Sequence, residues 1–177
     1  MTWARIGMGL GYLVAITLSA VAAGYWLLIP SASTAVDEFL QFSERSVDGV
    51  EEDELMDPLI AARGDVLPAV IKAIPFMAMP MQAYAVTFLG NQGDRRSLAL
   101  LHQLLGSEAE NAALRSDALQ SIARVDPQEG RRLALLYRDR ADAIGFMANQ
   151  VLKGALLEKR PRGLAIRNVI SERLTRR

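Results

Sequence analysis

The chain of 177 residues contains no cysteine and only one histidine, His102. Without thiols it cannot form disulfides, thiolate metal sites or a cysteine nucleophile, and one histidine cannot supply a pair of imidazole ligands. The sequence also lacks a nucleophile elbow, a phosphate-binding loop and a dinucleotide fingerprint. We therefore expect no catalytic residue, no cofactor and no metal site, and we interpret His102 as a residue at the edge of an apolar helix face.

Strand patterns are missing as well. Apolar residues do not alternate with polar ones, and they recur instead at spacings of three and four residues, the period of a helix. Glycine and proline interrupt this period at short intervals. The sequence therefore predicts an all-α protein, with a turn or two at 35–43, a loop at 75–80, and helices at about 55–60, 66–74, 83–89, 98–105, 114–123, 129–138, 143–157 and 163–174.

The sequence does contain one long apolar run. Between Ile6 and Ile29 there are 24 residues without a charged side chain. As a helix rising about 1.5 Å per residue, they would cover about 36 Å, and the hydrocarbon core of a bilayer is about 30 Å thick. Trp3, Tyr25 and Trp26 flank the run as aromatic belts flank a spanning helix. The run therefore predicts a transmembrane anchor.

A cleaved signal peptide is the competing interpretation of this region. Arg5 supplies a charged start, and Ala20-Val21-Ala22 fits a cleavage site. The apolar run continues past that site and ends only at Pro30, which favours an uncleaved anchor over residues 1–30.

The charges beside the anchor predict its orientation. Arg5 and the amino terminus precede the run, whereas Asp37 and Glu38 are the first charges after it. The positive-inside rule then predicts a single-pass protein of the plasma (inner) membrane, with a cytoplasmic N-terminus and a periplasmic domain.

One face of the predicted anchor carries small residues at every fourth position, an arrangement that lets another helix approach closely. Small residues are also common in membrane helices generally. We interpret the stripe as a contact with integral membrane subunits or with a second copy, formed by Gly7, Gly11, Ala15, Ser19 and Ala23.

Charge is balanced overall and unevenly placed. Ten acids and two bases lie between Asp37 and Asp65, whereas the last 25 residues, from Lys153, hold eight bases and two acids. We interpret 31–52 as an acidic juxtamembrane linker, and the basic tail as either solvated or bound to an acidic protein or anionic headgroups. Nucleic acid is not an expected partner, because no aromatic residues are interleaved with these bases.

Breaks in the helical pattern recur along the soluble part, at Gly64-Asp65, Gly93-Asp94, Asp126-Pro127 and Arg160-Pro161. Their spacing of about 30 residues is typical of solenoids built from helical hairpins. A single hairpin cannot bury its apolar face alone, so several must stack. The spacing therefore predicts a stack of hairpins over residues 53–177, with a basic C-terminal segment.

The residues around these breaks resemble a known family. Ala83 to Asp94, followed by Leu98 to Leu105, is similar to a HEAT-like repeat, in which a first helix ends in Leu-Gly, a turn ends in Gly-Asp, and a second helix is rich in leucine. Arg115 to Ala123 resembles the first helix of a next unit, and Leu59 to Ile74 a degenerate preceding unit. The resemblance covers about 59–137 and implies a short, right-handed α-solenoid. The last 40 residues would be a divergent unit or a capping pair.

Two groups of residues in the repeat region are candidates for partner contacts. The segment at 75–81 has an unusual series of apolar residues, Phe76, Met77, Met79 and Met81. Its methionines could bind Cu(I), pack between hairpins, or form an apolar docking loop. The second group consists of arginines near hairpin turns, namely Arg95, Arg96, Arg131, Arg132 and Arg138.

The sequence thus favours a non-enzymatic scaffold, an accessory subunit of a larger bacterial membrane assembly. A tether confines the repeats to the plane of the membrane, where weak contacts suffice. Because some HEAT-like proteins are bilin lyases, the resemblance also allows a membrane-tethered enzyme or chromophore-handling protein. A third interpretation is a binder of anionic lipid surfaces through the basic tail.

Overall fold

The computed structural model describes residues 23–42, 52–156 and 158–175. Their regular elements are helices, which confirms the predicted all-α class, and a single β-type bridge joins Ser31 to Arg63. No helix in these ranges is long and apolar enough to cross a membrane. Residues 23–28 are helical, and the rest of the predicted anchor lies outside the described residues.

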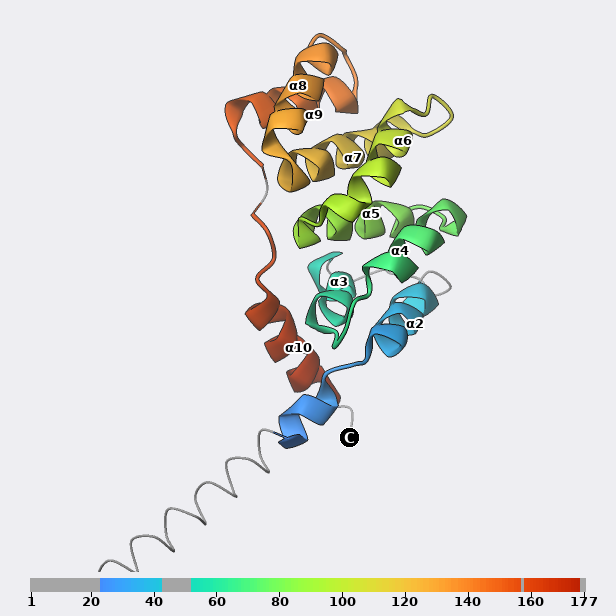
Figure 1. The fold of residues 1–177 in the computed structure, drawn as a ribbon, viewed down its shortest axis with the longest axis vertical. Helices are drawn as coiled ribbons and strands as arrows, with labels where there is room; N and C mark the ends of the chain where they lie inside the picture. Colours follow the sequence, from blue (N-terminus) through green and yellow to red (C-terminus); the bar gives the residue numbers. More distant parts are fainter. Residues whose placement is uncertain (1–22, 43–51, 157, 176–177) are drawn as a thin grey trace, which may run out of the picture.

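The helices are short rods joined by tight turns (Figure 1). The first half of the described chain contains α2 (Ala32–Phe42), α3 (Glu52–Ala61), α4 (Leu67–Ala73), the 3-10 turn η1 (Ile74–Phe76) and α5 (Met81–Gln92). The second half contains η2 (Arg95–Ser97), α6 (Leu98–Gly106), α7 (Ala112–Val125), α8 (Pro127–Tyr137), α9 (Ala143–Lys153) and α10 (Arg162–Thr175).

Polar side chains define where several of these helices begin. Each accepts hydrogen bonds from backbone N–H groups two or three residues further on, which pairs donors that a helix start otherwise leaves open. These caps are Asp94 before η2, Asn111 before α7, Asp126 before α8 and Asp142 before α9.

Two helices end at a glycine in the left-handed conformation. Gly93 ends α5 with φ 67°, and Gly154 ends α9 with φ 72°. Because glycine has no Cβ, it adopts this conformation without steric cost. The cap at Gly154 ends α9 at Lys153, four residues before the predicted end at Leu157.

The centre of the stack is α7, which packs against α5, α6, α8 and α9. The Ser121 hydroxyl of α7 donates a hydrogen bond of 2.9 Å to the Val86 carbonyl of α5, and Arg115 Nε donates one of 2.9 Å to the Leu105 carbonyl of α6. These polar groups are buried, so their bonds fix how the helices lie against one another. The buried apolar side chains form one continuous core from α2 to α10.

Residues 32–42 form a core helix, although the sequence analysis assigned them to an acidic linker. Ala35, Val36 and Phe39 lie on one face of α2 and are buried, Phe39 completely. The acidic Asp37 and Glu38 lie on the more accessible side. The linker interpretation rested on the charges, whereas the helical turns predicted at 35–43 coincide with most of α2. The rest of the linker that precedes α3 lies outside the described residues.

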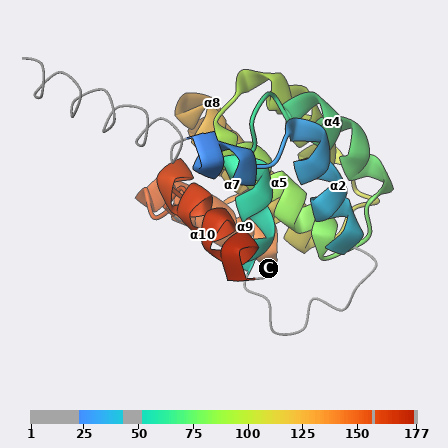
Figure 2. The same cartoon turned by 90° about the horizontal axis from the view of Figure 1, so that it is seen from below.

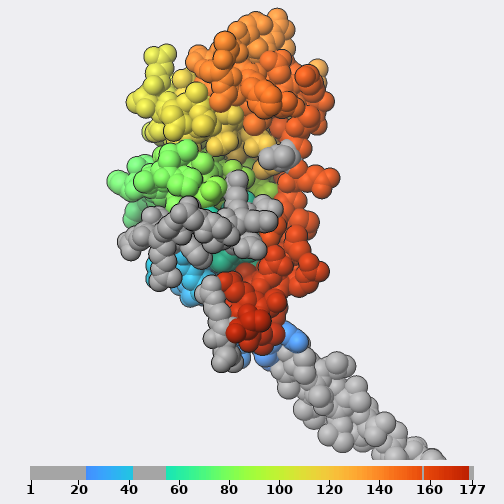
Figure 3. Space-filling view, turned by 180° about the vertical axis from the view of Figure 1, so that it is seen from behind, coloured from blue at the N-terminus to red at the C-terminus, as the bar shows by residue number. Residues whose placement is uncertain are grey.

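The last helix returns to the start of the domain. After α9 the chain descends along one edge of the molecule without regular structure, and α10 then lies along α3 (Figures 1, 2 and 3). Asp57 of α3 accepts hydrogen bonds from Arg160 at 2.5 and 2.7 Å and from the Asn168 amide at 3.0 Å. The segment from Arg160 through α10 therefore holds the C-terminal part of the chain against α3, and we call it the C-terminal clasp.

Candidate functional site

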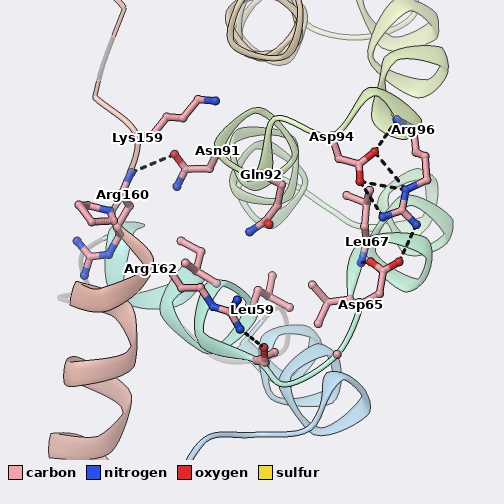
Figure 4. A pocket seen from close by; sticks show the side chains of 15 residues that line it. Leu59, Asp65, Leu67, Asn91, Gln92, Asp94, Arg96, Lys159, Arg160 and Arg162 are labelled. Atoms are coloured by element: carbon pink, nitrogen blue, oxygen red, sulfur yellow. Dashed lines mark hydrogen bonds and ion pairs between the residues drawn. The ribbon is translucent and has the colours of Figure 1, made fainter.

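A pocket of about 510 Å³ lies where three segments distant in sequence meet: the α3–α4 connection, the end of α5 with η2, and the descending segment before α10 (Figure 4). Leu59, Leu67 and Pro161 supply apolar lining, and charged side chains occupy two sides. Its size is typical of small-molecule and peptide-binding pockets.

On one wall, Arg96 joins two carboxylates. Its Nη1 donates to Asp65 at 2.6 Å, while Nε and Nη2 donate to Asp94 at 3.0 and 2.7 Å. The guanidinium hydrogen bonds lower the pKa of both carboxyls from the ordinary value of 3.8. Each aspartate also accepts a hydrogen bond from the backbone N–H two residues further on, so a single arginine connects two successive turns.

We predict that Arg96→Ala raises the pKa of both Asp65 and Asp94. Because the folded-state pKa values are lowered, the network adds stability above about pH 4 and loses it as the pH falls through those lowered values. NMR titration of the two side-chain carboxyl carbons measures the shift. Arg95→Ala is the matched control, since Arg95 pairs with Asp126 at 2.9 Å. Unchanged pKa values in Arg96→Ala would contradict the assignment.

The facing wall presents nitrogen donors. Arg162 donates to the Ala62 carbonyl at 3.1 Å through Nη2, and its remaining N–H groups have no acidic partner among the described residues. Lys159 likewise lacks an acidic partner in this part of the chain. Gln92 points between the two walls (Figure 4). This side can therefore hydrogen bond an anionic or carbonyl group of a bound molecule.

The two carboxyls of the pocket are poorly matched to proton transfer near neutral pH. A general acid or base works best with a pKa near the operating pH, whereas the pKa values of Asp65 and Asp94 are lowered. His102 is outside the pocket lining, half-exposed on α6, with Nε2 3.6 Å from Glu129 Oε1. The described residues contain no cluster of three or more metal-ligating side chains.

The structure separates the four apolar residues predicted at 75–81. Met81 is buried, and Met77 packs against the core, whereas Phe76 is 87% exposed and Met79 is 43% exposed. Met77 and Met81 thus fit the packing interpretation, whereas Phe76 and Met79 are exposed as the docking interpretation requires. Met81 is turned into the core, so a thioether cluster of all three methionines is not present.

Four of the five predicted arginines have acidic partners within the chain. Arg95 pairs with Asp126 at 2.9 Å, and Arg96 with Asp65 and Asp94. Arg132 pairs with Glu129 at 2.7 Å, and Arg138 with Asp139 at 3.4 Å. Arg131 is exposed and has no acidic partner among the described residues. Only Arg96 lines the pocket.

Sequence reasoning missed the exposed apolar side chains on α8 and α9. Leu135 is 48% exposed, Leu136 69% and Phe146 65%. Leu133 and Ala134 face the core, and Leu136 lies about 200° around the helix from Ala134. The run of four apolar residues at 133–136 could have indicated this, since it circles the whole helix.

The predicted small-residue stripe cannot be assessed as a unit. Ala23 is helical and exposed, whereas Gly7, Gly11, Ala15 and Ser19 lie outside the described residues. Comparison with known proteins adds no relative: no family model, curated protein or solved structure matches this chain.

Proposed function

We propose that this protein is a membrane-anchored, non-enzymatic scaffold, an accessory subunit of a larger bacterial membrane assembly. In this proposal the apolar run that begins at Ile6 spans the plasma membrane with a cytoplasmic N-terminus, its last residues join the helical domain, and that domain binds its partner on the periplasmic side. The observation that carries the proposal is the exposure of three large apolar side chains on the two adjoining helices α8 and α9, namely Leu135, Leu136 and Phe146, which we name together the distal apolar surface.

The distal apolar surface has the composition of a protein interface. Large exposed apolar side chains are uncommon where a domain otherwise buries its apolar residues in one core, and they mark contact sites when polar groups surround them. Arg131, Arg132 and Arg138 are exposed on the same helix or at its end. Interfaces are enriched in aromatic residues and arginine. A partner with an apolar patch bordered by carboxylates fits this surface.

A ladder of ion pairs between successive turns supports the HEAT-like interpretation of the stack. Arg96 pairs with Asp65 and Arg95 pairs with Asp126, and each pair spans 31 residues. Asp94 and Asp126 cap the segments that follow them, and Asp65 accepts a hydrogen bond from the Leu67 N–H just before α4. Equivalent caps at equivalent turns are what stacked repeats produce.

The position of the distal apolar surface agrees with a tethered scaffold. The helices α8 and α9 lie at one end of the long axis, and residues 23–28 lie at the other (Figure 1). A domain anchored through its N-terminus would therefore present this surface away from the bilayer. The tether raises the effective concentration of the repeats for a membrane partner, so a small interface suffices.

The distal apolar surface can be tested by charge substitution. We expect the full-length chain, purified in mild detergent, to bring down a defined partner, and Leu136→Glu or Phe146→Glu to reduce its recovery about tenfold or more, because burying one such side chain contributes about 1.5–3 kcal/mol. Gln103→Glu is the control, since it adds the same charge at an exposed position of α6 that belongs to none of the candidate contact surfaces. A solitary monomer, or equal recovery in all variants, would count against this surface.

A further inference from the structure

The end of the apolar run is fixed to the helical domain. Ile29 and Pro30 are buried, and the Arg63 N–H donates to the Pro30 carbonyl at 2.8 Å. Ser31 forms the adjoining bridge with Arg63, and α2 begins at the next residue. The α3–α4 connection, which contains Arg63, therefore lies directly beside the point where the chain leaves the helical residues 23–28.

Three consecutive large side chains just before this point are exposed. Tyr25 is 48% exposed, Trp26 58% and Leu27 73%. At about 100° per residue, three successive positions point in different directions around a helix, so the domain shields little of this turn. Tyrosine and tryptophan prefer the headgroup level of a bilayer, where one part of the ring is in an apolar and another in a polar environment.

Arg63 brings an unsatisfied cation to the same place. Its guanidinium carbon lies 5.7 Å from the centre of the Trp26 ring, within the range of a cation–π contact. Its Nε is buried and has no hydrogen-bond partner in the described structure. Leaving a buried donor without an acceptor costs free energy. A guanidinium stacked on a ring keeps the N–H groups along its edge, and these can donate to an acceptor that lies in the plane of the guanidinium.

The C-terminal end of α10 lies at the same end of the long axis (Figures 1 and 3). There Leu174 is 51% exposed, and Arg173 Nη2 donates to Glu38 at 2.5 Å, which neutralises an acid of α2. This end therefore combines exposed apolar side chains with a cation, Arg63, that has no acidic partner among the described residues. A phospholipid surface has the complementary chemistry, with phosphates above acyl chains.

We propose that this end of the domain binds phospholipid headgroups, with Trp26 at the headgroup level and Arg63 hydrogen bonded to a lipid phosphate. The inference rests on the proposed membrane anchor. Arginine matches phosphate geometry with two parallel N–H···O bonds, and its stacking on Trp26 orients the guanidinium toward the bilayer. Arg63 thereby sets the height and tilt of the domain, and with them the direction in which the distal apolar surface faces.

The test uses the full chain with Trp3→Phe, which leaves Trp26 as the only tryptophan because the sequence contains two. In phosphatidylcholine vesicles we expect blue-shifted Trp26 emission and stronger quenching by bromine near the headgroup than by bromine at the acyl-chain ends. Arg63→Ala should lower the headgroup-level quenching about two- to five-fold, the strength of a cation–π contact. Arg131→Ala, at the opposite end, should leave it unchanged.

Micelles separate phosphate binding from packing. Loss of the cation–π contact should change the Trp26 emission in any detergent, so Arg63→Ala should change it more in a phosphocholine detergent than in a maltoside detergent, which has no phosphate. An equal change in both detergents, or no change in either, would overturn the headgroup contact. Flotation of the vesicles tests the membrane anchor separately. If the chain floats but Trp26 remains exposed to water, the headgroup contact is wrong and the anchor stands. If the chain does not float, both the anchor and the headgroup contact are wrong.

Discussion

Replacing Arg160 with alanine is expected to lower the free energy of unfolding by about 3–5 kcal/mol, the usual cost of removing one partner of a buried ion pair. The Arg160 side chain is 11% exposed and that of Asp57 4%. Arg160 Nε and Nη2 lie 2.5 and 2.7 Å from the two Asp57 oxygens. Among the described residues, alanine would leave the buried Asp57 carboxylate with the Asn168 amide as its remaining side-chain donor.

The loss should appear first in the C-terminal clasp. The Arg160 backbone N–H also donates to Asn91 at 3.1 Å, so this residue ties α10 to both α3 and α5. In Arg160→Ala, hydrogen exchange should accelerate in α10 before it does so in α7, which keeps its own partners. Arg160→Lys retains the charge without the two-pronged geometry and should show an intermediate loss.

Chemical denaturation of the full chain in detergent, followed by circular dichroism, measures this effect. Arg138→Ala is the matched control, because Arg138 pairs with Asp139 at 3.4 Å and both side chains are exposed. Exposed pairs contribute about 0–1 kcal/mol. Equal losses in Arg160→Ala and Arg138→Ala would contradict the view that the clasp holds the C-terminal part of the chain against α3.

The helices could be predicted from sequence because their signals are local. An apolar period of three to four residues and the polar caps at Asp94, Asp126 and Asp142 act within one turn of the chain. The clasp could not be predicted in this way. Arg160 and Asp57 are 103 residues apart, and a contact over that distance leaves no periodic trace in the sequence. The pocket beside the clasp was missed for the same reason.

The candidate surfaces were predicted in part. The arginines near turns were predicted as contact residues, and one of them, Arg96, does line the pocket. The sequence could not show that Arg95 pairs with Asp126 at another turn, or that Arg132 pairs with Glu129 on its own helix. Alternating methionines indicated an unusual segment without revealing that Met81 turns inward. The sequence identifies residue types that are common in partner interfaces. Which of those side chains are exposed to solvent depends on how the helices pack.

One glycine that the sequence presented as a helix stop has another role. Gly90 was placed at the end of a helix, yet α5 continues through it to Gln92. A Cβ at Gly90 would lie 2.6 Å from Ser121 Oγ and 2.8 Å from Ser121 Cα. Gly90 is therefore present because α5 and α7 pack closely there. Gly130 of α8 is a second glycine of this kind, since it packs against α7. We expect its substitution to lower the stability of the fold strongly.

Gly130→Ala is expected to destabilise the fold by about 3 kcal/mol, at the upper end of the usual cost of overpacking. A Cβ on Gly130 would lie 2.3 Å from Ala123 Cα and 2.9 Å from Ala123 N. These are backbone atoms of α7 and cannot rotate away, so α8 would have to move as a whole. The gain in helix propensity from glycine to alanine, about 1 kcal/mol, opposes this cost without cancelling it.

Gly163→Ala separates the two contributions, because it lies in α10 and a Cβ there meets nothing within 4 Å. This control should raise the free energy of unfolding by up to about 1 kcal/mol, through helix propensity alone. Thermal and denaturant unfolding of the two variants should therefore shift in opposite directions. Since α8 carries Leu135 and Leu136, Gly130→Ala should also displace the distal apolar surface and weaken partner recovery, whereas Gly163→Ala should leave recovery intact. If Gly130→Ala is as stable as the unaltered chain, α7 and α8 do not pack as closely as the structure shows.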